Sequence, residues 1–145
     1  MSVDVEVVRE TTDELVDAFA GLLPQLSATA QPIDHDAGAR MVGSNSNSLL
    51  VARLDGTIVG MLTLVMFPLP SGLRARIEDV VVDGGARGHG IGRALTDEAV
   101  RLAKAAGART VDLTSRSSRE AANRLYERVG FEARDSKVYR LTISE

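Results

Sequence analysis

Residues 83–93 read DGGARGHGIGR, and they directly follow an apolar run that ends in Val80-Val81-Val82. Apolar residues recur at helical spacing after this stretch, so it is expected to join a buried strand to an amphipathic helix. Its glycines allow a tight turn and let a ligand approach the backbone without meeting a Cβ atom. The first N–H groups of the helix have no intrahelical partner and lie at its positive end. The stretch is therefore a candidate phosphate-binding loop, with Arg87 and Arg93 as cations. The alternative is a plain strand-to-helix turn, for which one glycine would suffice.

Two common phosphate motifs do not fit this loop. A P-loop ends in Gly-Lys followed by Ser or Thr, whereas this chain has Gly92-Arg93-Ala94. The dinucleotide fingerprint GxGxxG/A also fails. A start at Gly88 puts Arg93 in its last position, and a start at Gly90 puts Leu95 there. Neither a P-loop nor a Rossmann unit is therefore expected.

The surrounding sequence predicts an α+β fold, in which helices flank a mixed, mostly antiparallel sheet with the element order β-α-α-β-β-β-α-β-α-β. Asp55-Gly56 lies between two apolar runs and indicates a tight hairpin turn. The helix after the glycine-rich loop is expected to reach about Ala106, where Gly107 stops it. The expected strands span residues 3–8, 49–54, 57–67, 73–82, 109–114 and 137–143.

Local signals predict where the other helices begin and end. A capping box of Thr11 with Glu14 is expected to open the first helix, and Pro24 is expected to end it. Asp34 is expected to cap a short helix that reaches about Val42. A second capping box, Ser117 with Glu120, predicts a helix over residues 118–129.

Composition excludes several classes of protein. The chain has 145 residues, enough for a single domain over 1–145. Its formal net charge of −3 argues against a nucleic-acid binder, and the absence of cysteine removes disulfides and thiolate nucleophiles. With only His35 and His89, no metal-ligating cluster is expected. No signal peptide and no run of about 20 apolar residues is found, so a cytoplasmic protein that does not enter the membrane is expected.

The loop also contains the pattern Arg/Gln-x-x-Gly-x-Gly/Ala, at Arg87, Gly90 and Gly92. Here the sequence resembles the GNAT family of N-acetyltransferases. The segment LYERVGF over residues 125–131 is similar to a second motif of that family and follows in the same order. The resemblance covers residues 48–143 and implies that they form the acetyl-CoA-binding and catalytic core. It fades over residues 1–47, and residues 9–48 would form the helices on the substrate side.

The resemblance implies transfer of an acetyl group from acetyl-CoA to a primary amine of a small molecule. Because the chain has no cysteine to carry the acetyl group, direct attack within a ternary complex is expected. A protein or peptide amine is the alternative acceptor, and a non-catalytic CoA-binding regulatory domain is the alternative function. No metal and no nucleic acid is expected to take part, and a homodimer is compatible with the resemblance.

The resemblance also assigns the residues that would hold acetyl-CoA. The backbone of the expected strand over residues 73–82 would contact the pantetheine arm. The Val80 N–H would polarise the acetyl carbonyl, where negative charge develops during attack. Asn123 and Tyr126 would lie near the same arm, although Asn123 could also face solvent. The full set is Val80, Val81, Val82, Arg87, Gly88, His89, Gly90, Ile91, Gly92, Arg93, Asn123 and Tyr126.

Three residues are expected to take part in catalysis. A base must remove a proton from the attacking amine, and Glu78 is the first choice and Asp79 the second. Side chains alternate along a strand, so the two carboxylates should lie on opposite faces. The alternative is that one of them pairs with Arg74 or Arg76. Tyr126 would give a proton to the departing thiolate, unless it only fills the core.

Overall fold

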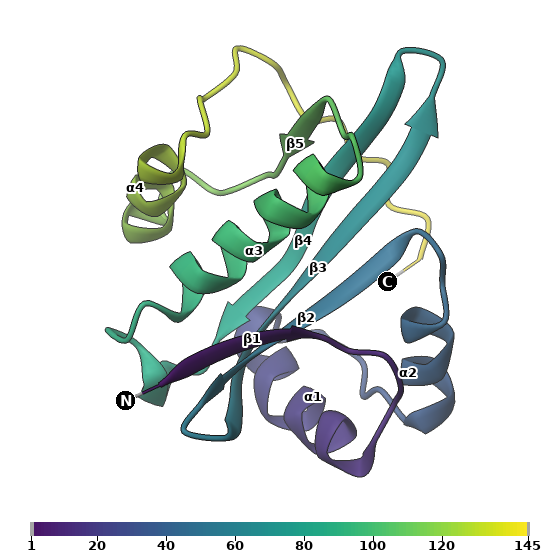
Figure 1. Cartoon of the computed structure of the whole chain (residues 1–145), viewed down its shortest axis with the longest axis vertical. Helices are drawn as coiled ribbons and strands as arrows, with labels where there is room; N and C mark the ends of the chain where they lie inside the picture. The colour runs from purple at the N-terminus through teal and green to yellow at the C-terminus, as the bar shows by residue number, and fades with distance from the viewer. Residues whose placement is uncertain (1, 145) are drawn as a thin grey trace. The chain divides into compact units, whose positions relative to one another are not determined.

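The computed structural model describes residues 2–144, and a five-stranded sheet occupies the first part of the chain (Figure 1). The strands follow one another across the sheet in chain order, and all neighbours are antiparallel except the last pair, which is parallel. This confirms the mixed, mostly antiparallel sheet. The strands are β1 (Val3–Val7), β2 (Asn47–Leu54), β3 (Thr57–Leu69), β4 (Gly72–Val82) and β5 (Thr110–Asp112).

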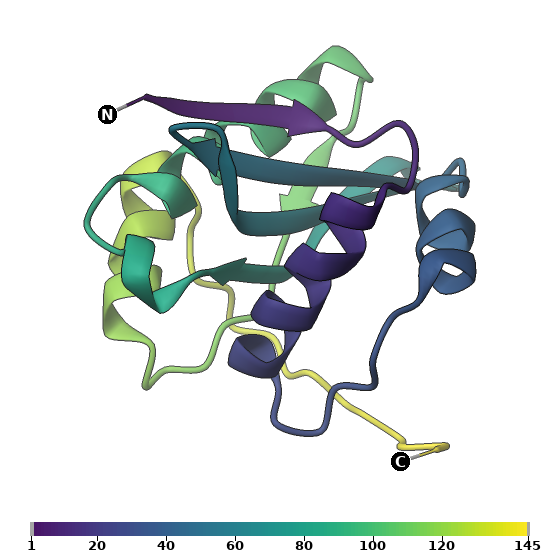
Figure 2. The ribbon, with the colours of Figure 1, turned by 90° about the horizontal axis from the view of Figure 1, so that it is seen from below.

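The chain divides into two compact units, Met1–Thr114 and Ser115–Glu145, which are described separately. Three α-helices of the first unit cover the sheet: α1 (Asp13–Leu26), α2 (His35–Val42) and α3 (Ile91–Ala105). Helices α1 and α3 lie on opposite faces (Figure 2). Side chains alternate between the two faces along a strand. In β2, Leu49 and Val51 point to the α1 face, where they belong to the core cluster around α1.

Two turns that the sequence predicts are present. Asp55 and Gly56 both have positive φ, +50° and +88°, as a two-residue primed hairpin turn requires. Gly107, with φ of +85°, follows the end of α3. Asp34 caps α2 by accepting a hydrogen bond from the Ala37 N–H.

The first capping box is wrong by one residue. Thr12, not Thr11, caps α1 and accepts from the Leu15 N–H at 3.1 Å. Pro24 does not end the helix, which continues to Leu26. Pro24 has no N–H to donate to the carbonyl four residues earlier, but the helix continues past it, and the Ser27 N–H still donates to the Leu23 carbonyl at 3.0 Å.

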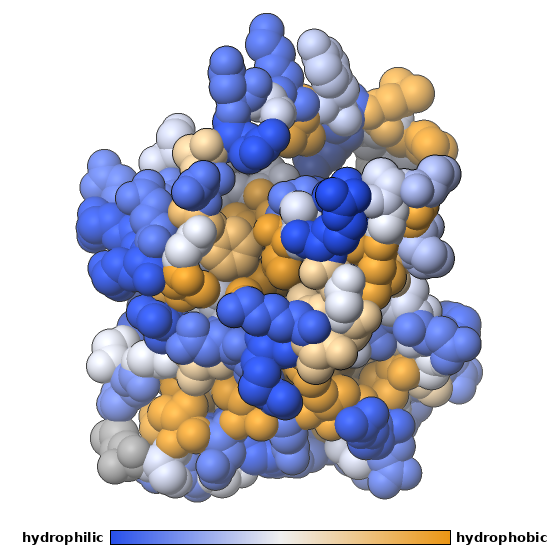
Figure 3. Space-filling model, turned by 45° about the horizontal axis from the view of Figure 1, so that its top comes forward, coloured by the Kyte–Doolittle hydropathy of each residue, from blue (hydrophilic) through white to orange (hydrophobic). Residues whose placement is uncertain are grey.

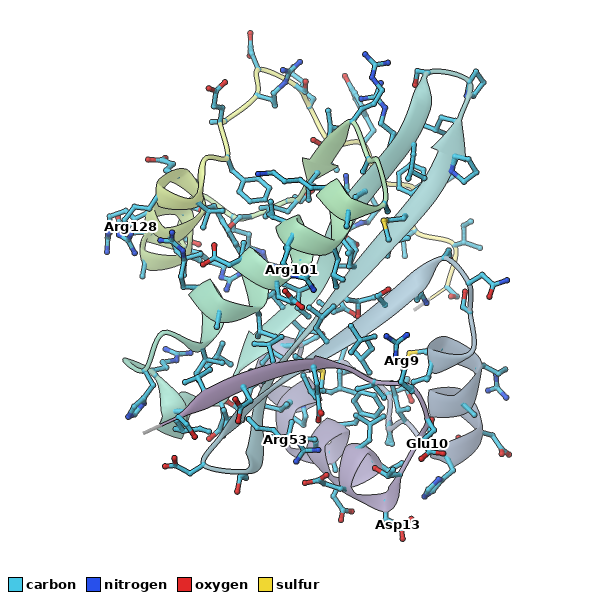
Figure 4. All side chains as sticks on the ribbon, in the orientation of Figure 1. Arg9, Glu10, Asp13, Arg53, Arg101 and Arg128 are labelled. Atoms are coloured by element: carbon cyan, nitrogen blue, oxygen red, sulfur yellow. The ribbon has the colours of Figure 1, made fainter. Side chains whose placement is uncertain are left out.

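Polar side chains cover much of the face seen in Figure 3, with patches of apolar side chains between them. Arg53, labelled in Figure 4, donates hydrogen bonds to Glu6 at 2.7 Å and to both carboxylate oxygens of Glu14 at 2.8 Å. The hydrogen bond from Arg53 lowers the pKa of Glu14. Glu14 therefore connects α1 to β2 and does not take part in a capping box.

In the second unit, α4 spans Glu120–Val129 and ends at Gly130, whose φ is +120°. Its N-cap residue is Arg119, which makes no side-chain capping bond, so the capping box of Ser117 with Glu120 is wrong. The helix begins two residues later than predicted.

The predicted last strand, residues 137–143, is also wrong. No strand of the described residues pairs with this segment, and a strand exists only where a neighbour completes its hydrogen bonds. Its large apolar side chains are 70–92% exposed: Val138, Tyr139, Leu141 and Ile143. The observed order therefore ends at α4, without the final β element.

Candidate active site

A β-bulge interrupts β4 at the two residues after Glu78. Thr63 of β3 pairs with Glu78 and Met61 pairs with Val81, so Asp79 and Val80 face a single residue of β3. Asp79 has a φ of +50°, a region that few residues other than glycine adopt, although aspartate does so more readily than most. A bulge releases backbone groups from the regular ladder, and it does so here at the residue expected to polarise a carbonyl, Val80.

Among residues 2–144, no strand pairs with the opposite edge of β4 along the same stretch. Strand β5 pairs only with Arg74, Ala75 and Arg76, so from Ile77 to Val82 no strand of the described residues lies on that side. Backbone N–H and C=O groups on such an edge can bind an extended ligand, as a further strand would. The edge runs directly toward the glycine-rich loop.

The loop begins with a short 3₁₀ turn, η1 (Gly84–Ala86), and leads into α3 through Gly90. Gly90, with φ of +74°, is the N-cap residue and supplies no side-chain cap, so the first N–H groups of α3 remain available. A Cβ atom at Gly88 or Gly90 would meet nothing within 4 Å. The outer face of the loop is therefore open, and an anion can reach the helix N-terminus.

The cationic side chains beside this N-terminus differ in their partners. Arg93 donates through Nε to both carboxylate oxygens of Asp97, one helical turn further along α3, at 3.1 and 3.0 Å. Arg87 lies exposed in the loop. The imidazole of His89 is turned back onto the Ala86 carbonyl, 3.0 Å from Nδ1. Since a carbonyl only accepts, Nδ1 donates this hydrogen bond and carries the proton.

The two carboxylates differ in environment. Burial, and then the charge of Glu78, raise the pKa of Asp79. Glu78 has one weak partner, Arg76, whose guanidinium lies 3.5 Å from a carboxylate oxygen and 3.2 Å from the Thr114 hydroxyl. Glu78 thus makes the contact with Arg76 that "Sequence analysis" gave as the alternative to a role as base. At 3.5 Å this contact is weak, and it leaves the carboxylate free to bind another group.

The bulge also changes the faces on which these side chains lie. Glu78 pairs through Thr63 with Leu49, and Val81 pairs through Met61 with Val51. Leu49, Met61, Val51 and Val81 all belong to the core cluster under α1. Glu78 therefore lies on the α1 face together with Val81, although they are three residues apart.

In the second unit, Tyr126 is the buried residue of α4. Its ring meets Phe131 edge to face, with centroids 5.9 Å apart. Burial raises the pKa of the phenol, and the charge of Arg119 opposes this shift. The side chain of Asn123 donates to the Arg116 carbonyl at 3.0 Å, which leaves its amide oxygen available.

One residue that the sequence did not single out contacts the loop. Gln25, in the last turn of α1, hydrogen-bonds to both Asp83 and Gly84. No sequence signal indicates this contact, because 58 residues separate Gln25 from Asp83.

Two features are absent from residues 2–144. No group of three or more His, Asp or Glu side chains could hold a metal ion, and none of the described helices is long and apolar enough to cross a membrane.

Comparison with known proteins links this geometry to one family. Residues 10–131 match the family model described as acetyltransferase (GNAT) family. The chain is 36% identical over 77 residues to a mycothiol acetyltransferase of Beutenbergia cavernae, a match that covers 53% of this chain and 25% of that protein. The chain thus spans about a quarter of the length of this relative.

Two solved structures are similar over nearly the whole chain. An acetyltransferase of Trypanosoma brucei is 27% identical, with a TM-score of 0.79 over 98% of this chain and 100% of that one. A transcriptional regulator of Bacillus halodurans is 28% identical, with a TM-score of 0.79 over 97% and 100%. The described elements are thus those of an acetyltransferase fold.

Proposed function

Because the chain belongs to the acetyltransferase (GNAT) family, we propose that it binds acetyl-CoA and transfers the acetyl group to a primary amine of a small molecule. The observation that carries this proposal is the unpaired edge of β4, which is bulged at Asp79 and leads into the uncapped N-terminus of α3. An extended arm that ends in a pyrophosphate fits such a surface, since the arm bonds to the edge and the phosphates to the helix N-terminus.

Acetyl-CoA would supply the acetyl group as a thioester. In the proposal, the backbone of Val80, Val81 and Val82 aligns the pantetheine arm, and the Val80 N–H donates to the acetyl oxygen as it gains charge. The N–H groups of the loop hold the pyrophosphate. Their residues are Arg87, Gly88, His89, Gly90, Ile91, Gly92 and Arg93, and the two arginines add charge.

Glu78 is the first assignment for the base and Asp79 the second. The position of Glu78 on the α1 face supports it, because the family resemblance assigns the substrate side to residues 9–48. The raised pKa of Asp79 supports the second assignment, since a base whose pKa lies closer to neutrality accepts a proton more readily. Glu78→Gln and Asp79→Asn distinguish the two, because only loss of the base should reduce kcat by about 100-fold or more.

Tyr126 would protonate the departing thiolate. This assignment rests on the family segment LYERVGF and on the raised pKa of the phenol, which keeps the proton on the oxygen at neutral pH. Asn123 would contact the pantetheine arm through its free amide oxygen. Direct attack in a ternary complex remains the proposed route, and it predicts intersecting rather than parallel lines in double-reciprocal plots.

The second candidate is a non-catalytic CoA-binding regulatory domain. It is favoured by the similarity to the transcriptional regulator of Bacillus halodurans.

Thermal unfolding with and without acetyl-CoA, followed by thiol release with a panel of amines, tests both candidates. Acetyl-CoA at 100 times its dissociation constant should add about 2.7 kcal/mol to the free energy of unfolding. A shift with thiol release supports the enzyme, and a shift without release from any amine or peptide supports the regulatory domain. The absence of any shift refutes both.

A further inference from the structure

Gln25 connects helix α1 to the start of the glycine-rich loop through both ends of its side-chain amide. The Nε2 group donates to Asp83 Oδ1 at 2.8 Å and to the Gly21 carbonyl at 3.0 Å. The Oε1 atom accepts from the Gly84 N–H at 2.9 Å. A side-chain amide carries both donors and an acceptor, so this one group can bond to two adjacent residues.

Asp83 and Gly84 lie where β4 becomes the loop. The Asp83 N–H donates to the Val59 carbonyl at 2.7 Å, and the Asp83 carbonyl accepts from the Ala86 N–H at 2.9 Å, which closes the turn of η1. The backbone of Asp83 is thus fixed by β3 and η1, and its side chain is fixed by α1. The direction in which the loop leaves the sheet depends on all three contacts.

The contact is more than a surface cap on α1. Gln25 is exposed, so burial of apolar surface does not hold its side chain in place. Its bond to the Gly21 carbonyl stays within α1, so only the bonds to Asp83 and Gly84 reach the loop. No other group of the described residues donates a hydrogen bond to the Asp83 carboxylate. The amide therefore bonds to two groups of the loop in addition to one carbonyl of its own helix.

We propose that Gln25 is a positioning residue for the phosphate loop, and that it aligns the N–H groups ahead of α3 for the pyrophosphate of acetyl-CoA. This inference rests on the proposed function. It also implies that α1, on the substrate side of the fold, is mechanically linked to the binding of the acetyl donor. Loss of the contact should weaken binding of acetyl-CoA and leave the chemical step unchanged.

Three variants test this inference. Gln25→Ala removes both contacts, and the KM and dissociation constant for acetyl-CoA should rise about three- to tenfold, tenfold being about 1.4 kcal/mol. Gln25→Glu keeps an acceptor for Gly84 but places a second carboxylate opposite Asp83, so it should bind acetyl-CoA at least as weakly. Adding Asp83→Asn to Gln25→Glu restores a donor–acceptor pair with the roles exchanged, and it should recover most of the affinity.

The control is Gln31→Ala, which removes the only other glutamine of the chain, also exposed. It should leave the KM for acetyl-CoA unchanged. For all variants, kcat and the KM for the amine should stay within about twofold of the parent protein, because only alignment of the loop is altered.

The outcomes separate this inference from the proposed function. If the parent protein shows no thermal shift with acetyl-CoA, the proposed function fails. If the parent protein binds acetyl-CoA and Gln25→Ala binds it equally well, the positioning role is refuted. If Gln25→Ala does not fold, the exchanged pair decides: recovery in the double variant supports the inference, and no recovery relative to Gln25→Glu overturns it.

Discussion

Gly60 of β3 allows α3 to lie directly against the sheet at the point where the phosphate loop ends. A Cβ atom at this position would lie 2.9 Å from Ile91 Cγ2, 3.3 Å from Leu95 Cδ1 and 3.3 Å from the Val81 carbonyl oxygen. The Cγ2 methyl belongs to a β-branched side chain with one strongly preferred rotamer in a helix, so it cannot move without its backbone. Overpacking of this kind costs about 1–3 kcal/mol. Gly60→Ala should destabilise the protein by that amount.

The same added methyl should have the opposite effect at Gly21. This glycine lies inside α1, and a Cβ atom there would meet nothing within 4 Å. Alanine is more favourable than glycine in a helix interior by about 0.8–1 kcal/mol. Gly21→Ala should therefore stabilise the protein, which makes it a matched control for Gly60→Ala.

Urea denaturation measures both changes, through the midpoint at constant slope. Because Ile91 is the first residue of α3, Gly60→Ala should also raise the dissociation constant for acetyl-CoA, whereas Gly21→Ala should not. A Gly60→Ala variant as stable as the parent protein would refute the close packing of α3 on β3. Lower stability with unchanged affinity would refute the link between that packing and the loop.

Four further substitutions test other parts of the structure. Thr12→Ala should cost about 1 kcal/mol, measured by urea denaturation, because Thr12 caps α1, whereas Thr11→Val should cost little, because the buried Thr11 hydroxyl has no hydrogen-bond partner in the described residues. Burial and then the charge of Glu78 raise the folded-state pKa of Asp79, so its ionised form costs stability at neutral pH and the cost fades as the pH drops through that pKa. Asp79→Asn should thus raise the melting temperature more at pH 7 than at pH 4, and an equal gain at both pH values would contradict this. Leu141→Ser should change the free energy of unfolding by less than about 0.5 kcal/mol, because this side chain is 87% exposed, and a loss of 2 kcal/mol or more would show that residues 137–143 are a paired strand after all.

The hairpin and the phosphate loop could be predicted because their signals are local. Asp55-Gly56 supplies two residues that tolerate positive φ, and the turn type follows from that alone. Gly88 and Gly90 likewise adopt the positive φ values for which glycine is suited. In both places the conformation depends on neighbouring residues of the chain rather than on distant partners.

The last strand could not be predicted reliably. An alternating pattern of apolar and polar residues indicates a preference for the extended conformation, but it does not show which strand would pair with the segment. Residues 137–143 have strand-like composition, but a strand also needs a neighbouring edge, and the sequence does not say whether one is available. The capping box failed for a related reason. Glu14 fits the local motif, but Arg53, 39 residues away, binds its carboxylate instead.

The two carboxylates of β4 illustrate how a single irregularity changes the faces that strand residues share. Regular alternation puts Glu78 and Asp79 on opposite faces and would separate Glu78 from Val81 in the same way. The bulge adds one residue, so Glu78 and Val81 share the α1 face, and Asp79 takes a positive φ between them. In the proposed function, the base Glu78 therefore reaches the amine from the α1 side of the sheet. Both carboxylates could be predicted as candidates from the sequence. Only the backbone geometry shows that Glu78 is the one on the α1 face.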